Sequence, residues 1–357
     1  MTIIAALLFS ITLPEWASWI LAFGAMSVGI LLLTKSADLF VDGAVALAHR
    51  MKMPPLIIGF TIVGFGTSAP EMLVSALSSA QGIPALALGN AYGSNITNIL
   101  LILGASMLIA PIALHRVALK RDLPFLATMI VLTWICSRTG DFSRANGALL
   151  LGCFVVYMVY QIVAARRQGN DAADAQKMPN MPLGKALLLT FGGLGVLLGS
   201  SQLLVGAAKW IAVRSAELVG ISQEATQLIV GVTVVALGTS LPELMASVSA
   251  MRKGQDDIAL GNVVGSNCFN LCVVATIAML IRPVENNMMP EALCGRDLYV
   301  MFATTLILWI PGLLVWLHAH RKNQGAAHPD IRLGRIFGVF YITLWVVYTV
   351  WVVIGTH

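Results

Sequence analysis

Long apolar stretches, separated by short polar ones, run along almost the whole chain. Most are long enough to cross a hydrocarbon core of about 30 Å as a helix. Lipid offers backbone groups no partner, so only helices or closed barrels span it, and the alternation of a barrel is absent here. We therefore predict ten transmembrane helices, at residues 17–48, 55–80, 84–112, 122–137, 146–165, 184–213, 225–251, 257–281, 297–317 and 336–355.

The basic residues between these spans support the count of ten. With ten spans, one side of the membrane receives fifteen Lys and Arg residues and the other receives six. Omitting the shortest span, 122–137, changes this to eleven against ten. Because basic loops stay in the cytoplasm, the richer side is cytoplasmic and both termini are external. We predict an integral protein of a bacterial inner (plasma) membrane.

One passage of forty residues occurs twice. Residues 59–98 and 231–270 align without a gap at an offset of 172, with 18 identical positions. The duplication predicts a first five-helix repeat at 17–165 (motif 59–112), a cytoplasmic linker at 166–183 and a second repeat at 184–355 (motif 231–284). Since five is odd, the second repeat enters from the opposite side. The predicted fold is an all-α membrane protein of ten helices in two inverted five-helix repeats.

Composition narrows the class of protein further. Hydrophobic residues make up 58% of the 357 residues and charged residues only 11%, against roughly a quarter in ordinary globular domains. The net charge of +5 sits in short loops, so it sets orientation and does not indicate nucleic-acid binding. Five cysteines, mostly within spans, predict no disulfide framework, and we expect Cys268 and Cys272 to be packing residues. The lipid bilayer is the expected surrounding, and no obligatory protein partner is implied.

The first duplicated motif is G-T-S-x-P-E, which ends at Glu71 and Glu243. Gly and Pro interrupt a helix and free backbone carbonyls, and Ser, Thr and Glu add the oxygen ligands that hard cations prefer. Each S-x-x-E also fits a capping box, a purely structural alternative. However, inverted symmetry brings two negative charges to one point at mid-membrane, where one divalent cation would neutralise both. We predict that these glutamates bind a cation.

The second duplicated motif is L-G-N-x-x-G-S-N-x-x-N. Its Ser and its last Asn, at i and i+4, lie on one helix face and can point at one site. These pairs are Ser94 with Asn98, and Ser266 with Asn270. For Asn95 and Asn267 we favour hydrogen bonding between helices instead.

In the first span, Lys35, Asp38 and Asp42 have no charged counterparts in the second copy, and we expect Lys35 and Asp38 to pair near the membrane edge.

The doubled motifs resemble those of the cation/calcium antiporter superfamily, which includes the sodium/calcium exchangers of prokaryotic type. The resemblance covers both halves. It implies a core of the second, third, seventh and eighth spans, across which the first and sixth spans slide. It also implies that calcium binds to Glu71 and Glu243 with backbone oxygens at Thr67 and Thr239. The implied sodium ligands are Ser68, Ser240, Ser94, Ser266, Thr67, Thr239, and the carbonyls of Gly64 and Ala236. Asn98 and Asn270 are expected at the same site from their position on the helix face of the serines.

The function implied is secondary active antiport of Ca²⁺ against Na⁺ by alternating access, with both ions as substrates and no cofactor. The P-E pair argues against proton coupling, and Asn270 in place of Asp argues against a potassium requirement. Coupling to H⁺, or transport of another divalent cation such as Mn²⁺, remains an alternative within the same fold. A passive channel is a further alternative. An intramembrane hydrolase is disfavoured because all six His residues lie outside the span interiors.

Overall fold

The computed structural model describes residues 14–138, 142–168, 181–219, 236–283, 293–321 and 331–354, and this part of the chain is almost entirely helical. Six of its helical stretches are long and apolar enough to cross a membrane. A seventh is the pair Pro55–Thr67 and Ala69–Ala80, if the two pieces, bent by 42°, are one span. The protein is therefore a helical membrane protein.

The predicted spans and the observed elements agree closely in position. The first half comprises α2 (Glu15–Met51), α3 (Pro55–Ile58), η1 (Gly59–Val63), α4 (Gly64–Thr67), α5 (Ala69–Ala80), α6 (Pro84–Thr97), η2 (Asn98–Leu103), α7 (Gly104–Ile109), η3 (Ala118–Asp122), α8 (Leu123–Arg138) and α9 (Arg144–Gln168). The second half comprises α10 (Leu183–Leu187), η4 (Leu188–Gly192), α11 (Gly193–Val219), α13 (Ala236–Thr239), α14 (Leu241–Arg252), α15 (Asp256–Phe269), η6 (Asn270–Val274), α16 (Ala275–Ile281), η8 (Leu293–Asp297), α17 (Leu298–Arg321) and α18 (Arg335–Ile354). Segments labelled η are short π-helical turns that continue the neighbouring helices.

Two details differ from the sequence-based picture. The all-α prediction missed two three-residue strands, β1 (Ile112–Leu114) and β2 (Ile331–Leu333), which pair antiparallel. They are too short for a pattern of alternating polarity to reveal them. The start of the predicted span 225–251 lies outside the described residues, and so does most of the predicted linker.

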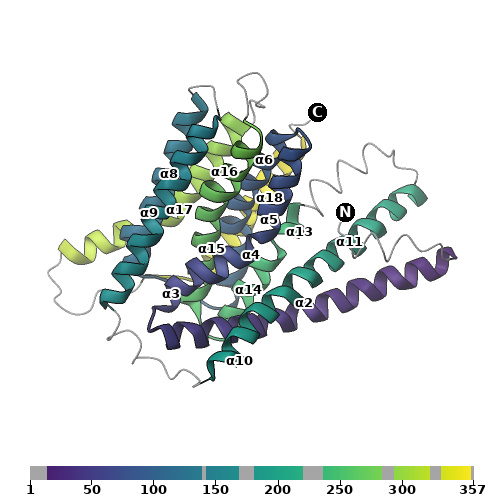
Figure 1. The fold of residues 1–357 in the computed structure, drawn as a ribbon, viewed down its shortest axis with the longest axis horizontal. Coiled ribbons are helices and arrows are strands. Elements are labelled where there is room, and N and C mark those ends of the chain that lie inside the picture. Colours follow the sequence, from purple (N-terminus) through teal and green to yellow (C-terminus); the bar gives the residue numbers. More distant parts are fainter. Residues whose placement is uncertain are drawn as a thin grey trace.

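Burial separates a core from a periphery. In α15–α16, 78% of the most apolar window is buried inside the protein, and in α6–α7 67% is buried, against 17% in α2 and 11% in α18. Figure 1 shows α4, α5, α14 and α15 at the centre of the molecule, with α8, α9 and α17 along one side. The two passages that carry the duplicated motifs therefore form the interior.

Two long helices, α2 and α11, run together obliquely past this core (Figure 1). Gly43 of α2 and Gly193 of α11 make the close approach possible. A Cβ on Gly43 would lie 2.5 Å from the backbone nitrogen of Thr190, and a Cβ on Gly193 would lie 2.8 Å from that of Phe40. Trp19 and Trp210 meet edge to face at 5.3 Å between ring centres.

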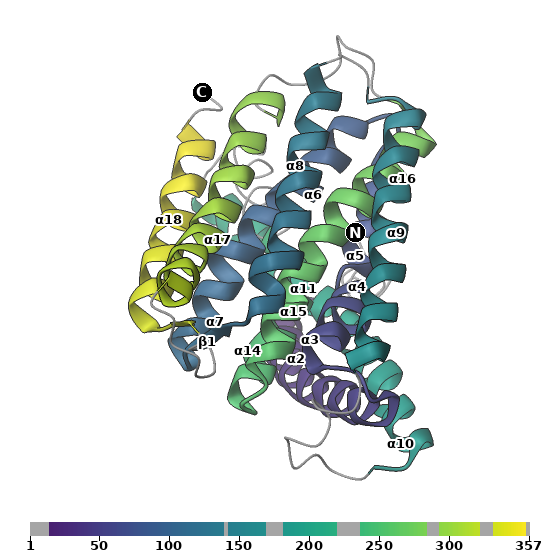
Figure 2. The ribbon, with the colours of Figure 1, turned by 90° about the vertical axis from the view of Figure 1, so that its left-hand side faces the viewer.

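On the opposite side, the two halves of the chain make matching contacts. Arg144, the first residue of α9, donates from Nε to the carbonyl of Leu280 at 3.1 Å. Arg335, the first residue of α18, donates from Nε to the carbonyl of Leu108, also at 3.1 Å. The two acceptors are 172 residues apart, the offset of the sequence repeat. In Figure 2 the helices α8, α9, α17 and α18 line this face of the molecule.

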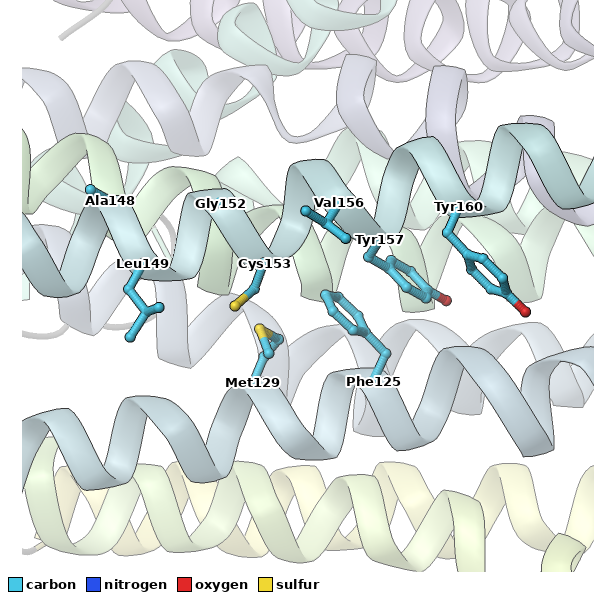
Figure 3. Close-up of a pocket in the computed structure, with 9 residues that line it drawn as sticks. All are labelled: Phe125, Met129, Ala148, Leu149, Gly152, Cys153, Val156, Tyr157 and Tyr160. Carbon is cyan, nitrogen blue, oxygen red and sulfur yellow. The ribbon is translucent and has the colours of Figure 1, made fainter.

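An apolar cleft of about 650 Å³ opens between α8 and α9. Phe125, Met129 and Tyr157 line it together with the small residues Gly152 and Cys153 (Figure 3). It lies on the peripheral helices, apart from the duplicated motifs.

Candidate cation-binding site

Each copy of the first motif breaks a helix at its serine. Ser68 lies between α4 and α5 with φ −78° and ψ 5°, and Ser240 lies between α13 and α14 with φ −88° and ψ 3°. A ψ near zero departs from the helical value of about −42°, so the chain turns at both serines. Pro70 and Pro242 follow in the first turn of the next helix, where a missing N–H is tolerated.

Neither serine caps the helix that follows it. The side chains of Ser68 and Ser240 make no capping hydrogen bond. Ser68 Oγ instead donates to Oε1 of Glu243 at 3.2 Å, and Ser240 lies beside Glu71. The capping alternative is therefore wrong for these serines, whose hydroxyls lie beside the glutamate of the opposite half.

Glu71 and Glu243 are fully buried in the core. Thr67 and Ser68 lie beside Glu243, and Thr239 and Ser240 lie beside Glu71, so the hydroxyls near each carboxylate come from the other half. Both carboxylate oxygens of Glu71 and Oε2 of Glu243 have no hydrogen-bond partner, and neither residue joins an ion pair of the described part. Two buried carboxylates without a counter-charge are costly unless a cation or a proton compensates them.

Oxygen atoms from α15 complete the wall beside Thr67. The hydroxyls of Thr67 and Ser266 are 3.5 Å apart, and both lie within hydrogen-bonding distance of the Gly64 carbonyl, at 3.5 and 3.4 Å. This requires the backbones to touch, because a Cβ on Gly265 would lie 2.6 Å from Cα of Phe60. Ala236, the counterpart of Gly64, is the first residue of α13, and its side chain lies outside the described part.

The predicted Asn ligands are buried and begin widened turns. Asn98 and Asn270 are the first residues of the π-helical segments η2 and η6, at matching positions in the two copies. Asn98 donates from Nδ2 to Oδ1 of Asn267 at 3.0 Å, and its own Oδ1 has no hydrogen-bond partner. Both polar atoms of the Asn270 amide are unpartnered. Ser94, one turn before Asn98, is buried as well.

Asn95 and Asn267 join the two halves reciprocally. Asn95 Nδ2 donates to the Asn267 carbonyl at 3.1 Å, and Asn267 Nδ2 donates to the Asn95 carbonyl at 3.2 Å. This is the hydrogen bonding between helices that the sequence predicted for the pair. Asn267 has a second effect, since its Oδ1 also fixes the orientation of the Asn98 amide.

Sequence reasoning missed four residues that support the carboxylates. Asn262 donates to the Glu243 carbonyl at 3.2 Å and to Ser247 Oγ at 2.9 Å. In the other half, Asn90 donates to the Glu71 carbonyl at 3.5 Å and to Ser75 Oγ at 3.3 Å. All four are identical between the copies at the offset of 172, and that signal could have identified them.

The charged residues of the first span pair differently from the prediction. Lys35 is exposed and forms no ion pair with Asp38 among the described residues. Asp38 accepts a hydrogen bond from Ser249 at 2.6 Å, and Asp42 pairs with Lys253 at 2.6 Å. Both partners lie in or directly after α14, and the local i, i+3 spacing gives no sign of this tertiary contact.

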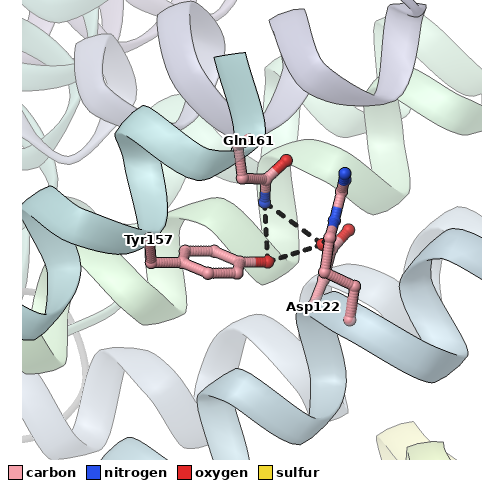
Figure 4. A network of polar contacts seen from close by, with 4 residues as sticks. Asp122, Tyr157 and Gln161 are labelled. Atoms are coloured by element: carbon pink, nitrogen blue, oxygen red, sulfur yellow. Dashed lines mark hydrogen bonds and ion pairs between the residues drawn. The ribbon is translucent and has the colours of Figure 1, made fainter. Parts of the chain in front are cut away.

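Two further carboxylates are buried outside the motifs. Asp122 accepts from Arg121 at 2.7 Å, from Tyr157 at 2.6 Å and from Gln161 at 3.1 Å (Figure 4). At the equivalent place in the second half, Asp297 accepts from Arg296 at 2.7 Å and from Tyr348 at 3.0 Å. Unlike the two glutamates, each of these aspartates forms an ion pair with an arginine side chain.

A model of the sodium/calcium exchanger protein family matches residues 21–163 and 185–354. The chain belongs to this family. CaxA of Alkalimonas amylolytica is 43% identical over 291 residues, which cover 80% of the chain and 88% of CaxA. The inner membrane protein YrbG of Escherichia coli K12 is 36% identical and aligns over 86% of the chain and 92% of YrbG.

A solved structure agrees with this membership of the sodium/calcium exchanger family. The sodium-calcium exchanger NCX_Mj, soaked with Na⁺ and Ca²⁺, matches with a TM-score of 0.73 at 29% identity, over 92% of this chain and 97% of that one. The family consists of transporters. This family member is therefore an ion transporter and not an enzyme. The ions are its substrates, and transport needs no cofactor.

Proposed function

We propose that this exchanger-family protein exchanges Ca²⁺ for Na⁺ across the membrane by alternating access, with Glu71 and Glu243 sharing one Ca²⁺. The observation that carries the proposal is the pair of fully buried carboxylates, three of whose four oxygens have no partner. A single divalent cation between them neutralises both charges. Carboxylate, hydroxyl and carbonyl oxygens are the ligands that Ca²⁺ prefers.

Sodium would use the same carboxylates with the neutral oxygens around them. The proposed ligands are the side chains or carbonyls of Thr67, Thr239, Ser68, Ser240, Ser94, Ser266, Asn98, Asn270, Gly64 and Ala236. Because Ca²⁺ and Na⁺ need the same two negative charges, they cannot bind fully at the same time. An empty site would leave two uncompensated charges buried. The protein therefore changes between its two access states at a lower free-energy cost with ions bound than without them. This coupling gives exchange and not leak.

We further propose the architecture that the sequence predicted: ten helices in two inverted repeats, 17–165 and 184–355, joined by a cytoplasmic linker. The matching contacts of Arg144 and Arg335 and the crossed hydroxyl–carboxylate contacts support this symmetry. The oblique pair α2 and α11, packed through glycines, is the element that would slide to alternate access. The termini would be external in a bacterial inner membrane.

Calcium flux in proteoliposomes tests the function. An opposing Na⁺ gradient should drive Ca²⁺ uptake, K⁺ should not be required, and the flux should be electrogenic if more than two Na⁺ move per Ca²⁺. Flux driven equally by a pH gradient without Na⁺ would favour the proton-coupled alternative. Competition by Mn²⁺ measures divalent selectivity, and Ca²⁺ movement without any counter-ion would indicate a channel.

A further inference from the structure

The side-chain amide of Asn262 uses its donors and its acceptor on three different groups. Its Nδ2 donates to the Glu243 carbonyl at 3.2 Å and to Ser247 Oγ at 2.9 Å. Its Oδ1 accepts from Thr67 Oγ1 at 3.2 Å, and the residue is fully buried. Asn262 thus connects the first turn of α14, which carries Glu243, to Thr67 beside the helix break in the other half of the chain.

The neighbours of Asn262 allow only one orientation of its amide. A carbonyl oxygen can only accept, so the atom facing the Glu243 carbonyl must be the NH₂ group. The amide oxygen then has to face Thr67. An amide oxygen only accepts, so in this contact Thr67 must be the donor.

This contact gives the Thr67 hydroxyl a second acceptor for its proton. A threonine within a helix ordinarily donates to the carbonyl four residues earlier, here Val63 at 3.1 Å. Thr67 also lies beside the Glu243 carboxylate. When a cation occupies the carboxylate, the hydroxyl must present a lone pair to it, and its single proton needs another acceptor. Asn262 Oδ1 is such an acceptor on the side of α15.

The equivalent residue in the other half is held more loosely. Asn90 makes the same two donations, but at 3.5 and 3.3 Å, and it is partly exposed where Asn262 is fully buried. The longer contacts indicate weaker hydrogen bonds, because N–H···O distances in proteins ordinarily lie between about 2.7 and 3.2 Å.

We propose that Asn262 is a positioning residue of the cation site, which orients the Thr67 hydroxyl and holds the first turn of α14 around Glu243. It acts through these two groups and does not itself contact the ion. The inference rests on the proposed function, because it assumes a cation at Glu243. Asn90 plays the same part in the first half with a smaller effect.

The experiment measures Ca²⁺ binding by the purified protein, by equilibrium binding of radioactive Ca²⁺, with Asn262→Ala and Asn90→Ala as matched variants. Asn262→Ala should weaken Ca²⁺ binding about tenfold, as expected for the loss of a buried hydrogen bond next to a charged site, and Asn90→Ala by less than about threefold. In proteoliposomes the loss should raise the KM for Ca²⁺ far more than it lowers the maximal rate.

A double variant separates positioning from general structural support. If Asn262 acts through Thr67, the losses caused by Thr67→Val and Asn262→Ala should not multiply when the two are combined. Losses that multiply, or equal losses in Asn90→Ala and Asn262→Ala, would overturn the proposal. If Asn262→Ala fails to fold, Ser247→Ala with Ser75→Ala as its control applies the same test, with a loss of about twofold to threefold expected only for Ser247→Ala.

Failure of the underlying function gives a different result. A wild-type protein that neither binds nor transports Ca²⁺ refutes the proposed cation site, and the positioning role with it. If the wild type binds Ca²⁺ and Asn262→Ala binds it equally strongly, the positioning role alone is refuted.

Discussion

The protein buries two kinds of carboxylate, and they differ in what surrounds them. Asp122 and Asp297, directly before α8 and α17, each lie against an arginine and a tyrosine hydroxyl. Glu71 and Glu243, in the centre, lie among neutral hydroxyls with oxygens left unpartnered. A carboxylate paired within the chain stabilises the fold, whereas an uncompensated one is suited to a cation from outside. From this comparison we propose a structural role for the two aspartates and a cation-binding role for the two glutamates.

The largest expected effect is on the central pair. Glu71→Gln and Glu243→Gln keep the shape of the side chain but remove half of the charge that a cation needs. Each should reduce Ca²⁺ transport at least about 100-fold, in line with the cost of leaving a buried charge without its partner, while the protein still folds and inserts. Elution from a sizing column and thermal melting serve as folding controls. Near-normal transport by either variant would contradict the assignment of the glutamates to function.

The paired aspartates should show the opposite behaviour. Asp122→Ala leaves the Arg121 guanidinium and the Tyr157 hydroxyl without their shared acceptor, with an expected loss of about 3–5 kcal/mol in the free energy of unfolding. Asp297→Ala should cost less, because the side chain of Asp297 is more exposed, at 10% against 2% for Asp122. Thermal melting measures this, while transport per folded molecule should stay within about twofold. A stable Asp122→Ala protein that cannot transport would reverse the comparison.

Both kinds of carboxylate lie in repeated sequence, but only the glutamates lie in the ungapped repeat. The glutamates stand in an ungapped repeat of forty residues, which predicted the helix breaks and the grouping of Thr67, Ser68 and Glu243. The aspartates stand in a second repeated tripeptide, Arg-Asp-Leu, at 121–123 and 296–298, whose offset of 175 falls outside that alignment. The repeat of the aspartates therefore differs from that of the glutamates by a gap of three residues.

Other features could not be predicted because they depend on tertiary packing. The partner of Asp42 is Lys253, more than 200 positions away, whereas the spacing along α2 predicted only a pair between Lys35 and Asp38. The amide orientation of Asn98 depends on Asn267 across the core. Local periodicity specifies which face of a helix is polar, but not which residue of another helix meets it.

The smallest expected effect concerns a carboxylate of an intermediate kind, at the edge of the core. Asp42 forms an ion pair, as Asp122 and Asp297 do. However, the side chains of Asp42 and Lys253 are 48% and 26% exposed, so solvent screens the pair. Lys253→Met should cost no more than about 1 kcal/mol of stability. Because the pair joins α2 to the end of α14, its loss should still change the exchange rate a few-fold if α2 slides.

A matched control is available for the Lys253 prediction. Arg214 and Glu217 form an exposed ion pair within the single helix α11, so Arg214→Met breaks no contact between helices. Exchange rates in proteoliposomes should change for Lys253→Met and not for Arg214→Met. Equal rates for both variants would mean that the contact between α2 and α14 has no part in transport.

The number of calcium ions bound per chain tests the shared site most directly. Equilibrium binding of Ca²⁺ to the purified protein without Na⁺ should give one ion per chain at the central site. Glu71→Gln and Glu243→Gln should each abolish that binding, since either carboxylate alone supplies half of the charge. Addition of Na⁺ should displace the bound Ca²⁺. One ion retained in both single variants, or two ions in the wild type of which each variant loses one, would contradict a single Ca²⁺ held between Glu71 and Glu243.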